Sequence, residues 1–192
     1  MKILISPAKS LDFENNVETS ISSKPIFADQ AHKINNTIKN LSAPDLSSLM
    51  NISPKLSELN WSRNQEFQKI DSKEKEAIFA FNGDVYDGID ANTINKSNHE
   101  KLQNSLRILS GLYGILKPFD KIKAYRLEMG TKISINGSKN LYDFWKENVT
   151  KSFSFAPCAG SVTVIVVDPF VAAKVISPAP VVCLMGVTSL KV

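Results

Sequence analysis

Cysteine and long apolar runs are nearly missing from this sequence. Its two cysteines, Cys158 and Cys183, are too few for a disulfide framework and too far apart for a CxxC pair. No apolar run approaches the roughly 18 residues that a membrane-spanning helix needs, and the one after Lys2 is too short for a signal peptide. These absences exclude a disulfide scaffold and a membrane bundle, and they indicate a cytoplasmic protein with no membrane partner.

Glycine and proline are not in excess either, at 8 and 9 residues of 192, which excludes collagen and wholesale disorder. With 43% hydrophobic and 22% charged residues, the composition is that of one globular domain. No GxxxxGKS/T or GxGxxG loop is present, and His32 and His99 have no cysteine or carboxylate partners at ligand spacing. We therefore predict no cofactor and no metal site. The net charge of +4 permits a polyanionic partner without requiring one.

The composition changes sharply near residue 151. Asparagine occurs 16 times before this point and never in residues 152–192, whereas valine rises from 3 to 10. Charge nearly vanishes in those last 41 residues, which keep only Asp168, Lys174 and Lys191. Two interpretations remain open: a shift in reading frame, or a β-rich terminal segment with strands at residues 162–167 and 181–185.

Short periodic segments predict both helices and strands in residues 1–151. Helical spacing of apolar residues predicts helices over residues 29–41, 44–50 and 102–109, and a further helix that begins at Pro54. Ser42 is placed to cap the second of these. Short β-prone or alternating runs predict strands at residues 2–5, 77–81 and 125–129. This mixture indicates a mixed α/β (α+β) fold.

Polar side chains gather at the ends of the predicted strands and at a glycine-rich bend over residues 110–118. In open α/β sheets, ligands bind beyond the carboxyl ends of the strands. One cleft could therefore combine Lys9 and Arg126 as cationic donors with carboxylates for hydrogen bonding or proton transfer. The competing interpretation is local ion pairing at the ends of elements. The candidate cleft residues are Lys9, Ser10, Asp12, Asp84, Tyr86, Ser110, Tyr113, Arg126 and Glu128.

A tight turn joins the second and third predicted helices and resembles a helix-hairpin-helix. In that motif, backbone N–H groups at a helix amino terminus bind a DNA phosphate, because unpaired N–H groups and the helix dipole favour an anion. Lys55 adds positive charge, whereas Ser53 stands where glycine is usual and Pro54 removes one donor. The alternative is a plain turn between two core helices. The DNA-binding candidates are Leu49, Ile52, Ser53 and Lys55.

Five segments resemble, in order, the motifs of the YaaA family of bacterial peroxide-stress proteins. They are residues 5–12 (ISPAKSLD), 81–86 (FNGDVY, with Gly88), 106–118 (LRILSGLYGILKP), 125–130 (YRLEMG) and 141–145 (LYDFW). The resemblance covers residues 1–151. It implies a cytoplasmic protein with a mixed α/β fold peculiar to the family, a helix-hairpin-helix-like element over residues 49–59 and a positively charged cleft.

The resemblance further implies binding to double-stranded DNA and limitation of oxidative damage when peroxide and free iron are present, with no established reaction. Family members continue beyond the LYDFW motif with a longer final third, which residues 152–192 do not resemble. We therefore expect a truncated or frame-shifted member, whose fold is incomplete at its carboxyl end. The alternative hypothesis is an enzyme that acts on a nucleotide or another phosphorylated ligand in the basic cleft.

Overall fold

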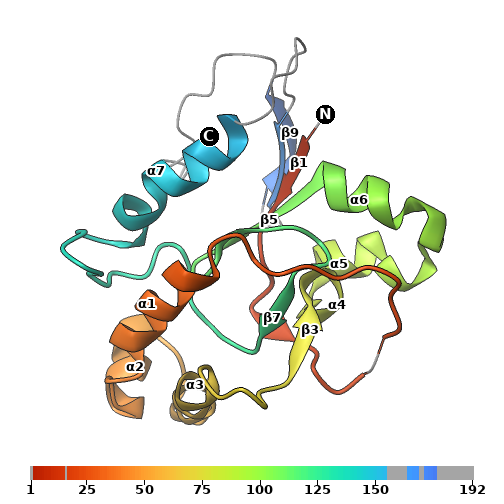
Figure 1. Cartoon of the computed structure of the whole chain (residues 1–192). Helices are drawn as coiled ribbons and strands as arrows, with labels where there is room; N and C mark the ends of the chain where they lie inside the picture. Colours follow the sequence, from red (N-terminus) through yellow and green to blue (C-terminus); the bar gives the residue numbers. More distant parts are fainter. Residues whose placement is uncertain (1, 16, 155–163, 169–170, 177–192) are drawn as a thin grey trace.

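A computed structural model describes residues 2–15, 17–154, 164–168 and 171–176 of the chain. Its centre is a five-stranded sheet in the order β6-β5-β1-β8-β9 (Figure 1). The central strand β1 pairs in parallel with β5 and β8, and the two outer strands pair antiparallel to their neighbours. The bounds are Lys2–Ile5 for β1, Leu106–Ser110 for β5, Gly114–Leu116 for β6, Val164–Asp168 for β8 and Val171–Ile176 for β9.

Strand β1 confirms the strand predicted at the start of the chain. Its sequence, KILI, is an apolar run with two β-branched residues, as expected for a strand that has parallel neighbours on both sides. Ile3 lies opposite Leu106 in β5 and opposite Ile165 in β8, and the side chains of Leu4 and Ile5 are buried. The first residues of the chain therefore occupy the middle of the sheet.

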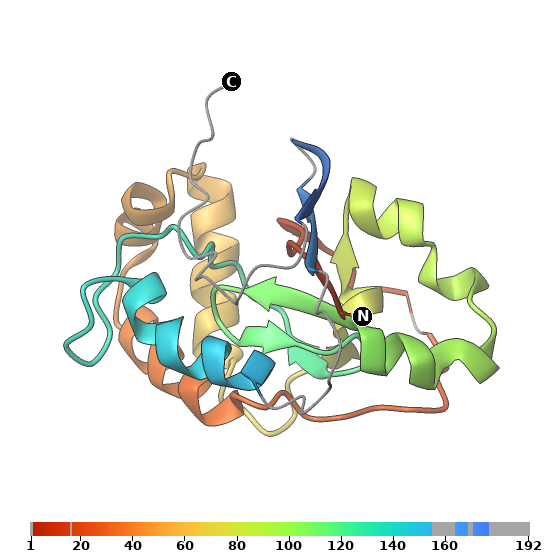
Figure 2. The same cartoon turned by 90° about the horizontal axis from the view of Figure 1, so that it is seen from above.

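Two groups of helices lie at opposite sides of the molecule. Figure 2 shows α1, α2 and α3 grouped on one side and α5 and α6 on the other, and the view in Figure 1 agrees. The helices are α1 (Ala28–Ile38), α2 (Ala43–Met50), α3 (Pro54–Glu66), α4 (Ala77–Ala80), α5 (Asp84–Ile89), α6 (His99–Ser105) and α7 (Leu141–Ser154), with the 3-10 turns η1 (Ala91–Thr93) and η2 (Lys96–Asn98).

The first three predicted helices are confirmed. Ser42 caps α2 in a capping box, in which its hydroxyl accepts from the Asp45 N–H and the Asp45 carboxylate accepts from the Ser42 N–H. Helix α2 ends at Asn51, whose φ of 50° is left-handed, a conformation that asparagine tolerates. Ser53 then caps α3, with Pro54 at its first position. Local sequence signals were sufficient for α2 and for the start of α3, because α2 carries its own start and stop and α3 carries its own start.

Two short antiparallel pairs complete the described strands. Strand β2 (Ser10–Leu11) pairs with β4 (Phe81–Asn82), and β3 (Glu74–Glu76) pairs with β7 (Lys121–Lys123). The first pair holds the segment after β1 in place. The segment around Lys9 and Asp12, which follows the strand predicted at residues 2–5, is therefore partly strand.

Three secondary-structure predictions were wrong. Within residues 77–81, the first four form the helical turn α4 and only Phe81 joins a strand, because the N–H groups of Ala77 and Ile78 donate to the carbonyls of Asp120 and Pro118. The predicted helix over residues 102–109 stops at Ser105, where the chain becomes β5 and pairs with β1. Residues 125–129 alternate in burial as predicted, yet they form no ladder with another described strand.

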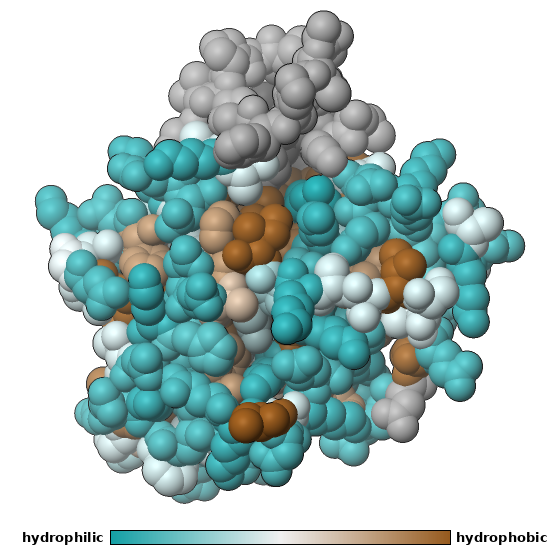
Figure 3. Space-filling view, viewed as in Figure 1, coloured by the Kyte–Doolittle hydropathy of each residue, from teal (hydrophilic) through white to brown (hydrophobic). Residues whose placement is uncertain are grey.

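The hydrophobic core lies between the central sheet and the helices that cover it. Its largest fully buried side chains include Trp145, Phe119, Ile34 and Leu46, from four separate elements or loops. The face shown in Figure 3 is mostly hydrophilic, with separate hydrophobic patches. Among the described helices, none is long and apolar enough to cross a membrane.

The boundary predicted at residue 151 falls inside α7, which continues to Ser154. The strand predicted over residues 162–167 is present as β8. The second predicted strand, at residues 181–185, lies outside the described residues, as do Cys158 and Cys183.

Candidate functional site

Lys9, Arg126 and Glu128 lie together, although 117 residues separate the first two. One Nη of Arg126 donates to the backbone carbonyl of Lys9 at 3.5 Å, and the other lies 3.4 Å from the Glu128 carboxylate. Lys9 Nζ lies 3.4 Å from the same carboxylate oxygen. Two cations from distant segments thus share one partly exposed carboxylate.

Arg63 of α3 is a fourth member of this group, which the sequence analysis missed. Its guanidinium is half-buried, and its pKa is lowered first by burial and then by the charge of the neighbouring Arg126. Its described hydrogen bond is to the Asn60 side chain, at 3.4 Å. We call Lys9, Arg63, Arg126 and Glu128 the basic cluster. It combines three positive charges with one negative charge.

Arg126 has unused hydrogen-bonding capacity within this cluster. Its side chain is 16% exposed, and its Nε–H is enclosed with no hydrogen-bond partner among the described residues. Its Nη contacts, at 3.4 and 3.5 Å, are longer than the 2.7–2.9 Å that is usual for charge-assisted hydrogen bonds. An anion that reached this guanidinium would therefore gain shorter bonds than the protein supplies.

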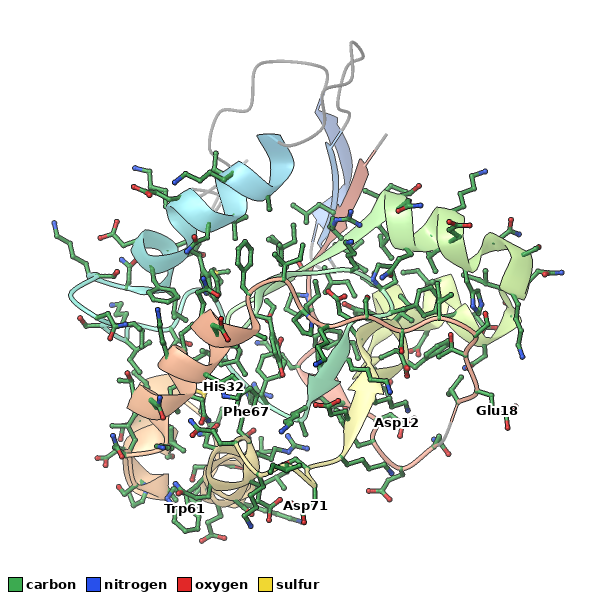
Figure 4. All side chains as sticks on the ribbon, viewed as in Figure 1. Asp12, Glu18, His32, Trp61, Phe67 and Asp71 are labelled. Carbon is green, nitrogen blue, oxygen red and sulfur yellow. The ribbon has the colours of Figure 1, made fainter. Side chains whose placement is uncertain are left out.

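Asp12 lies in a different group, although it was predicted to share one cleft with Lys9 and Arg126. Its carboxylate lies 3.2 Å from Nζ of Lys75, and that same Nζ donates to the Asp12 backbone carbonyl at 2.9 Å. The Asn15 side-chain amide, followed by the Asn15 N–H, lowers the pKa of Asp12 well below its usual range, and Lys75 contributes a smaller part. Figure 4 shows Asp12 close to β3, which carries Lys75. Through these contacts, Asp12 ties the segment after β2 to Lys75 of β3.

Ser10 and Asp84 are exposed near the junction of β2 and β4. Ser10 lies opposite Asn82 in the pair, and Asp84 begins α5 two residues later. The pairing of β2 with β4 therefore brings Ser10 and Asp84 to one region. Their binding roles stay predictions.

The three remaining cleft candidates are buried and have protein partners. The Tyr86 hydroxyl donates to the Ser6 carbonyl at 2.9 Å. The Ser110 hydroxyl lies 2.7 Å from the Tyr125 hydroxyl and accepts from the Tyr113 N–H. Burial raises the pKa values of Tyr86, Tyr113 and Tyr125 above the ordinary value for tyrosine. The structure therefore places Tyr86, Ser110 and Tyr113 under the surface, where they anchor the loops around the site.

The turn between α2 and α3 has the connectivity of a helical hairpin. Leu49 and Ile52 are half-buried, whereas Ser53 and Lys55 are exposed at the amino terminus of α3. The Leu56 N–H donates to the Ser53 hydroxyl at 3.4 Å, and Pro54 has no N–H. Among the described hydrogen bonds, the Lys55 N–H is thus left as the first-turn amide with no partner.

Helix α3 has an unusual burial pattern. Its buried side chains are the polar Ser57, Asn60 and Asn64, while Leu56 and Leu59 are 40% and 45% exposed. Asn60 donates to the Leu56 carbonyl of the same helix, which explains part of the buried polarity. The side of α3 that faces solvent is therefore partly apolar, between Lys55 at one end and Arg63 at the other.

Neither histidine joins a metal-binding group. His32 packs edge-on against Phe67, and His99 is buried against Phe119 with Nε2 3.2 Å from the Ile94 carbonyl. Over the described ranges, no three side chains of histidine, cysteine, aspartate or glutamate come together to hold a metal ion.

The fold and the cluster define a mixed α/β protein with a basic surface beside a helical hairpin. A family model described as "Peroxide stress protein YaaA" matches residues 1–168, and the chain belongs to this family. The match passes the compositional boundary at residue 151 and includes β8.

Curated relatives support the same assignment. A protein of Flavobacterium johnsoniae named "UPF0246 protein" is 49% identical over 156 residues, which are 80% of this chain and 62% of the relative. A "UPF0246 protein" of Clostridium perfringens is 49% identical over 156 residues, 79% of this chain and 60% of the relative. Another, of Shewanella halifaxensis, is 45% identical over 152 residues, 78% of this chain and 59% of the relative. The chain thus spans less than two thirds of the length of these relatives.

Proposed function

We propose that this protein acts in the cytoplasmic response to peroxide by binding double-stranded DNA without sequence preference, and that it thereby limits damage to DNA by peroxide and iron. Membership of the peroxide-stress family supports the biological setting. The basic cluster is the observation on which DNA binding chiefly rests. A surface with three cations and one carboxylate favours a polyanion, and contacts to phosphates do not depend on sequence.

The hairpin supplies a second phosphate contact in this proposal. The exposed Lys55 stands at the amino terminus of α3, where its own N–H is free of described partners and the helix dipole is positive. The Ser53 hydroxyl already accepts from the Leu56 N–H, and Pro54 has no N–H. The hairpin therefore offers fewer free backbone N–H groups to a phosphate than a glycine-rich one. We therefore expect weak binding, with a salt slope of only a few units in log K against log salt concentration.

Fluorescence anisotropy with duplexes of unrelated sequence tests this proposal. We expect Lys55→Glu to weaken the binding of all duplexes alike, by roughly tenfold or less, and to reduce the salt slope by about one to two units, since a cation is replaced by an anion. The matched control is Lys146→Glu, an exposed lysine on α7, a helix that lies away from α3 in Figure 1. Binding that responds to neither salt nor Lys55→Glu would contradict the role of the hairpin.

A specific observation supports a second candidate function, an enzyme that acts on a nucleotide or other phosphorylated ligand. Glu128 lies within 3.4 Å of both Lys9 and Arg126, so a carboxylate stands beside the cations that would hold a phosphate. A carboxylate at that position can accept a proton from a reacting group. Turnover of a phosphorylated substrate that is lost in Glu128→Gln would favour this candidate.

A further inference from the structure

The basic cluster and the hairpin are two ends of one stripe on α3. Leu56, Leu59 and Arg63 follow the spacing i, i+3, i+7 that places residues on one face of a helix, and Lys55 lies next to Leu56. Lys55 and Arg63 are eight residues apart, which is about 12 Å along the helix axis at a rise of about 1.5 Å per residue. One strand of duplex DNA, which rises about 3.4 Å per nucleotide, would span this distance with about three or four nucleotides.

The two ends of the stripe differ in charge and in enclosure. Lys55 is a single exposed cation. At the other end, Arg126 is 16% exposed, and Lys9, Arg63 and Arg126 outnumber the single carboxylate of Glu128 by two charges. An internal phosphodiester carries one negative charge, whereas a terminal phosphate monoester carries between about 1.5 and 2 at neutral pH. The cluster therefore matches a terminal phosphate in charge better than it matches an internal one.

We propose that Lys9, Arg63 and Arg126 bind a terminal phosphate monoester of a DNA strand, and that the adjoining nucleotides lie along Leu56 and Leu59 toward Lys55. This inference rests on the proposed function and specifies its substrate as DNA with phosphorylated ends. Arginine suits the task because its planar fork donates two parallel hydrogen bonds to a phosphate. The long contacts and the unpartnered Nε–H of Arg126 leave those donors available once the guanidinium turns away from Glu128.

The exposed leucines fit the same arrangement. Leu56 and Leu59 lie between the two cationic ends and are about two-fifths exposed, while polar residues of the helix are buried. Apolar side chains beside a phosphate-binding position can contact the sugars and base faces of a strand, and such contacts do not select sequence. The exposed leucines and buried polar residues of α3 are therefore consistent with a surface along which a DNA strand lies.

The test is anisotropy with one short duplex in three forms, which carry a 5′-phosphate, a 3′-phosphate or only hydroxyl groups at their ends. We expect one or both phosphate-ended forms to bind at least about tenfold more tightly than the hydroxyl-ended form, the effect of one charge-assisted hydrogen bond. The two phosphate arms show which end the cluster accepts. Equal affinity for all three forms would overturn the inference and leave the proposed function intact, whereas absence of any DNA binding would overturn both.

Substitutions then assign the preference to the cluster. We expect Arg126→Lys and Arg63→Lys to reduce the ratio between phosphate-ended and hydroxyl-ended affinities to about one, because lysine lacks the planar fork. Lys146→Glu should leave the ratio unchanged. Lys55→Glu should weaken all forms and preserve the ratio, since it acts on internal phosphates. If the ratio of phosphate-ended to hydroxyl-ended affinity is unchanged in both arginine variants, the terminal phosphate binds elsewhere and the inference is wrong. If a variant fails to fold, the ratio measured on the unaltered protein still tests the preference for a phosphorylated end.

Discussion

The indole N–H of Trp145 donates a 2.9 Å hydrogen bond to the carbonyl of Gly111, although 34 residues separate the two. Through the fully buried Trp145, this bond ties α7 to the turn between β5 and β6. The same ring covers Gly114, and Gly111 itself packs against the carbonyl of Leu127, next to the basic cluster. Two of the family-like motifs, residues 106–118 and 141–145, are thus the two sides of one contact.

Gly114 should tolerate no side chain. Its φ is +70°, and an added Cβ would lie 2.7 Å from the ring of Trp145. We expect Gly114→Ala to lower the free energy of unfolding by about 2 to 4 kcal/mol, from left-handed strain and overlap with a buried ring. Urea denaturation measures this. Gly88→Ala is the matched control, since a Cβ there meets nothing within 4 Å, and equal losses in the two variants would contradict the explanation.

Ser23 should stabilise a buried carboxylate in a pH-dependent way. Its hydroxyl donates to the fully buried Asp120 at 2.6 Å, and burial raises the pKa of Asp120 despite this bond. We expect Ser23→Ala to lower the free energy of unfolding by about 2 kcal/mol at neutral pH, because a charged acceptor loses a donor. The loss should shrink in acid, where Asp120 is protonated. Denaturation of both proteins at several pH values measures it, and a loss independent of pH would refute the assignment; Ser48→Ala, exposed on α2, is the control.

Asp12 should contribute stability that also disappears in acid. Its folded-state pKa is depressed below the ordinary value of 3.8, so its contribution is present above that pH and is lost as the pH falls through and below it. We expect Asp12→Asn to be less stable than the unaltered protein at pH 7 and to approach it in stability below about pH 4. Chemical denaturation across this range measures the difference. A constant gap down to pH 2 would show that the Lys75 and Asn15 contacts do not depend on the charge.

Glu128→Gln separates the two candidate functions. It removes the one carboxylate that lies among three cations, so a DNA-binding surface should gain affinity for a duplex by roughly two- to tenfold at low salt. An enzyme that uses this group as a base would lose turnover instead. Anisotropy and a phosphate-release assay on the same preparation measure the two outcomes. Weaker DNA binding in this variant would contradict the charge argument.

Local signals were sufficient for part of the fold. Ser42 and Asn51 mark the two ends of α2, Ser53 and Pro54 mark the start of α3, and apolar spacing predicted α1. The apolar run at residues 77–81 was ambiguous, because periodicity alone does not separate a buried helical turn from a buried strand. Its helical form depends on carbonyls near Asp120, some forty positions away in the chain.

The β5 error has a similar cause. Leu102, Leu106 and Leu109 share one helical face, yet the segment from Leu106 pairs with β1, so long-range pairing overrides local periodicity. For the site, the polar ends of predicted strands were enough to join Lys9, Arg126 and Glu128. Arg63 was missed because α3 was considered only for its amino terminus. Its place eight residues beyond Lys55 was the signal available.

The position of β1 sets the order in which this chain can complete its sheet. Residues 2–5 leave the ribosome before both of their partner strands, because they pair with residues 106–108 on one side and 164–167 on the other. At about 5–20 residues per second, both neighbours exist only roughly 8 to 30 seconds after the strand is made. Until its partners are made, this apolar strand has two unpaired edges. Chaperone contacts with residues 2–5 should therefore govern the yield of folded protein.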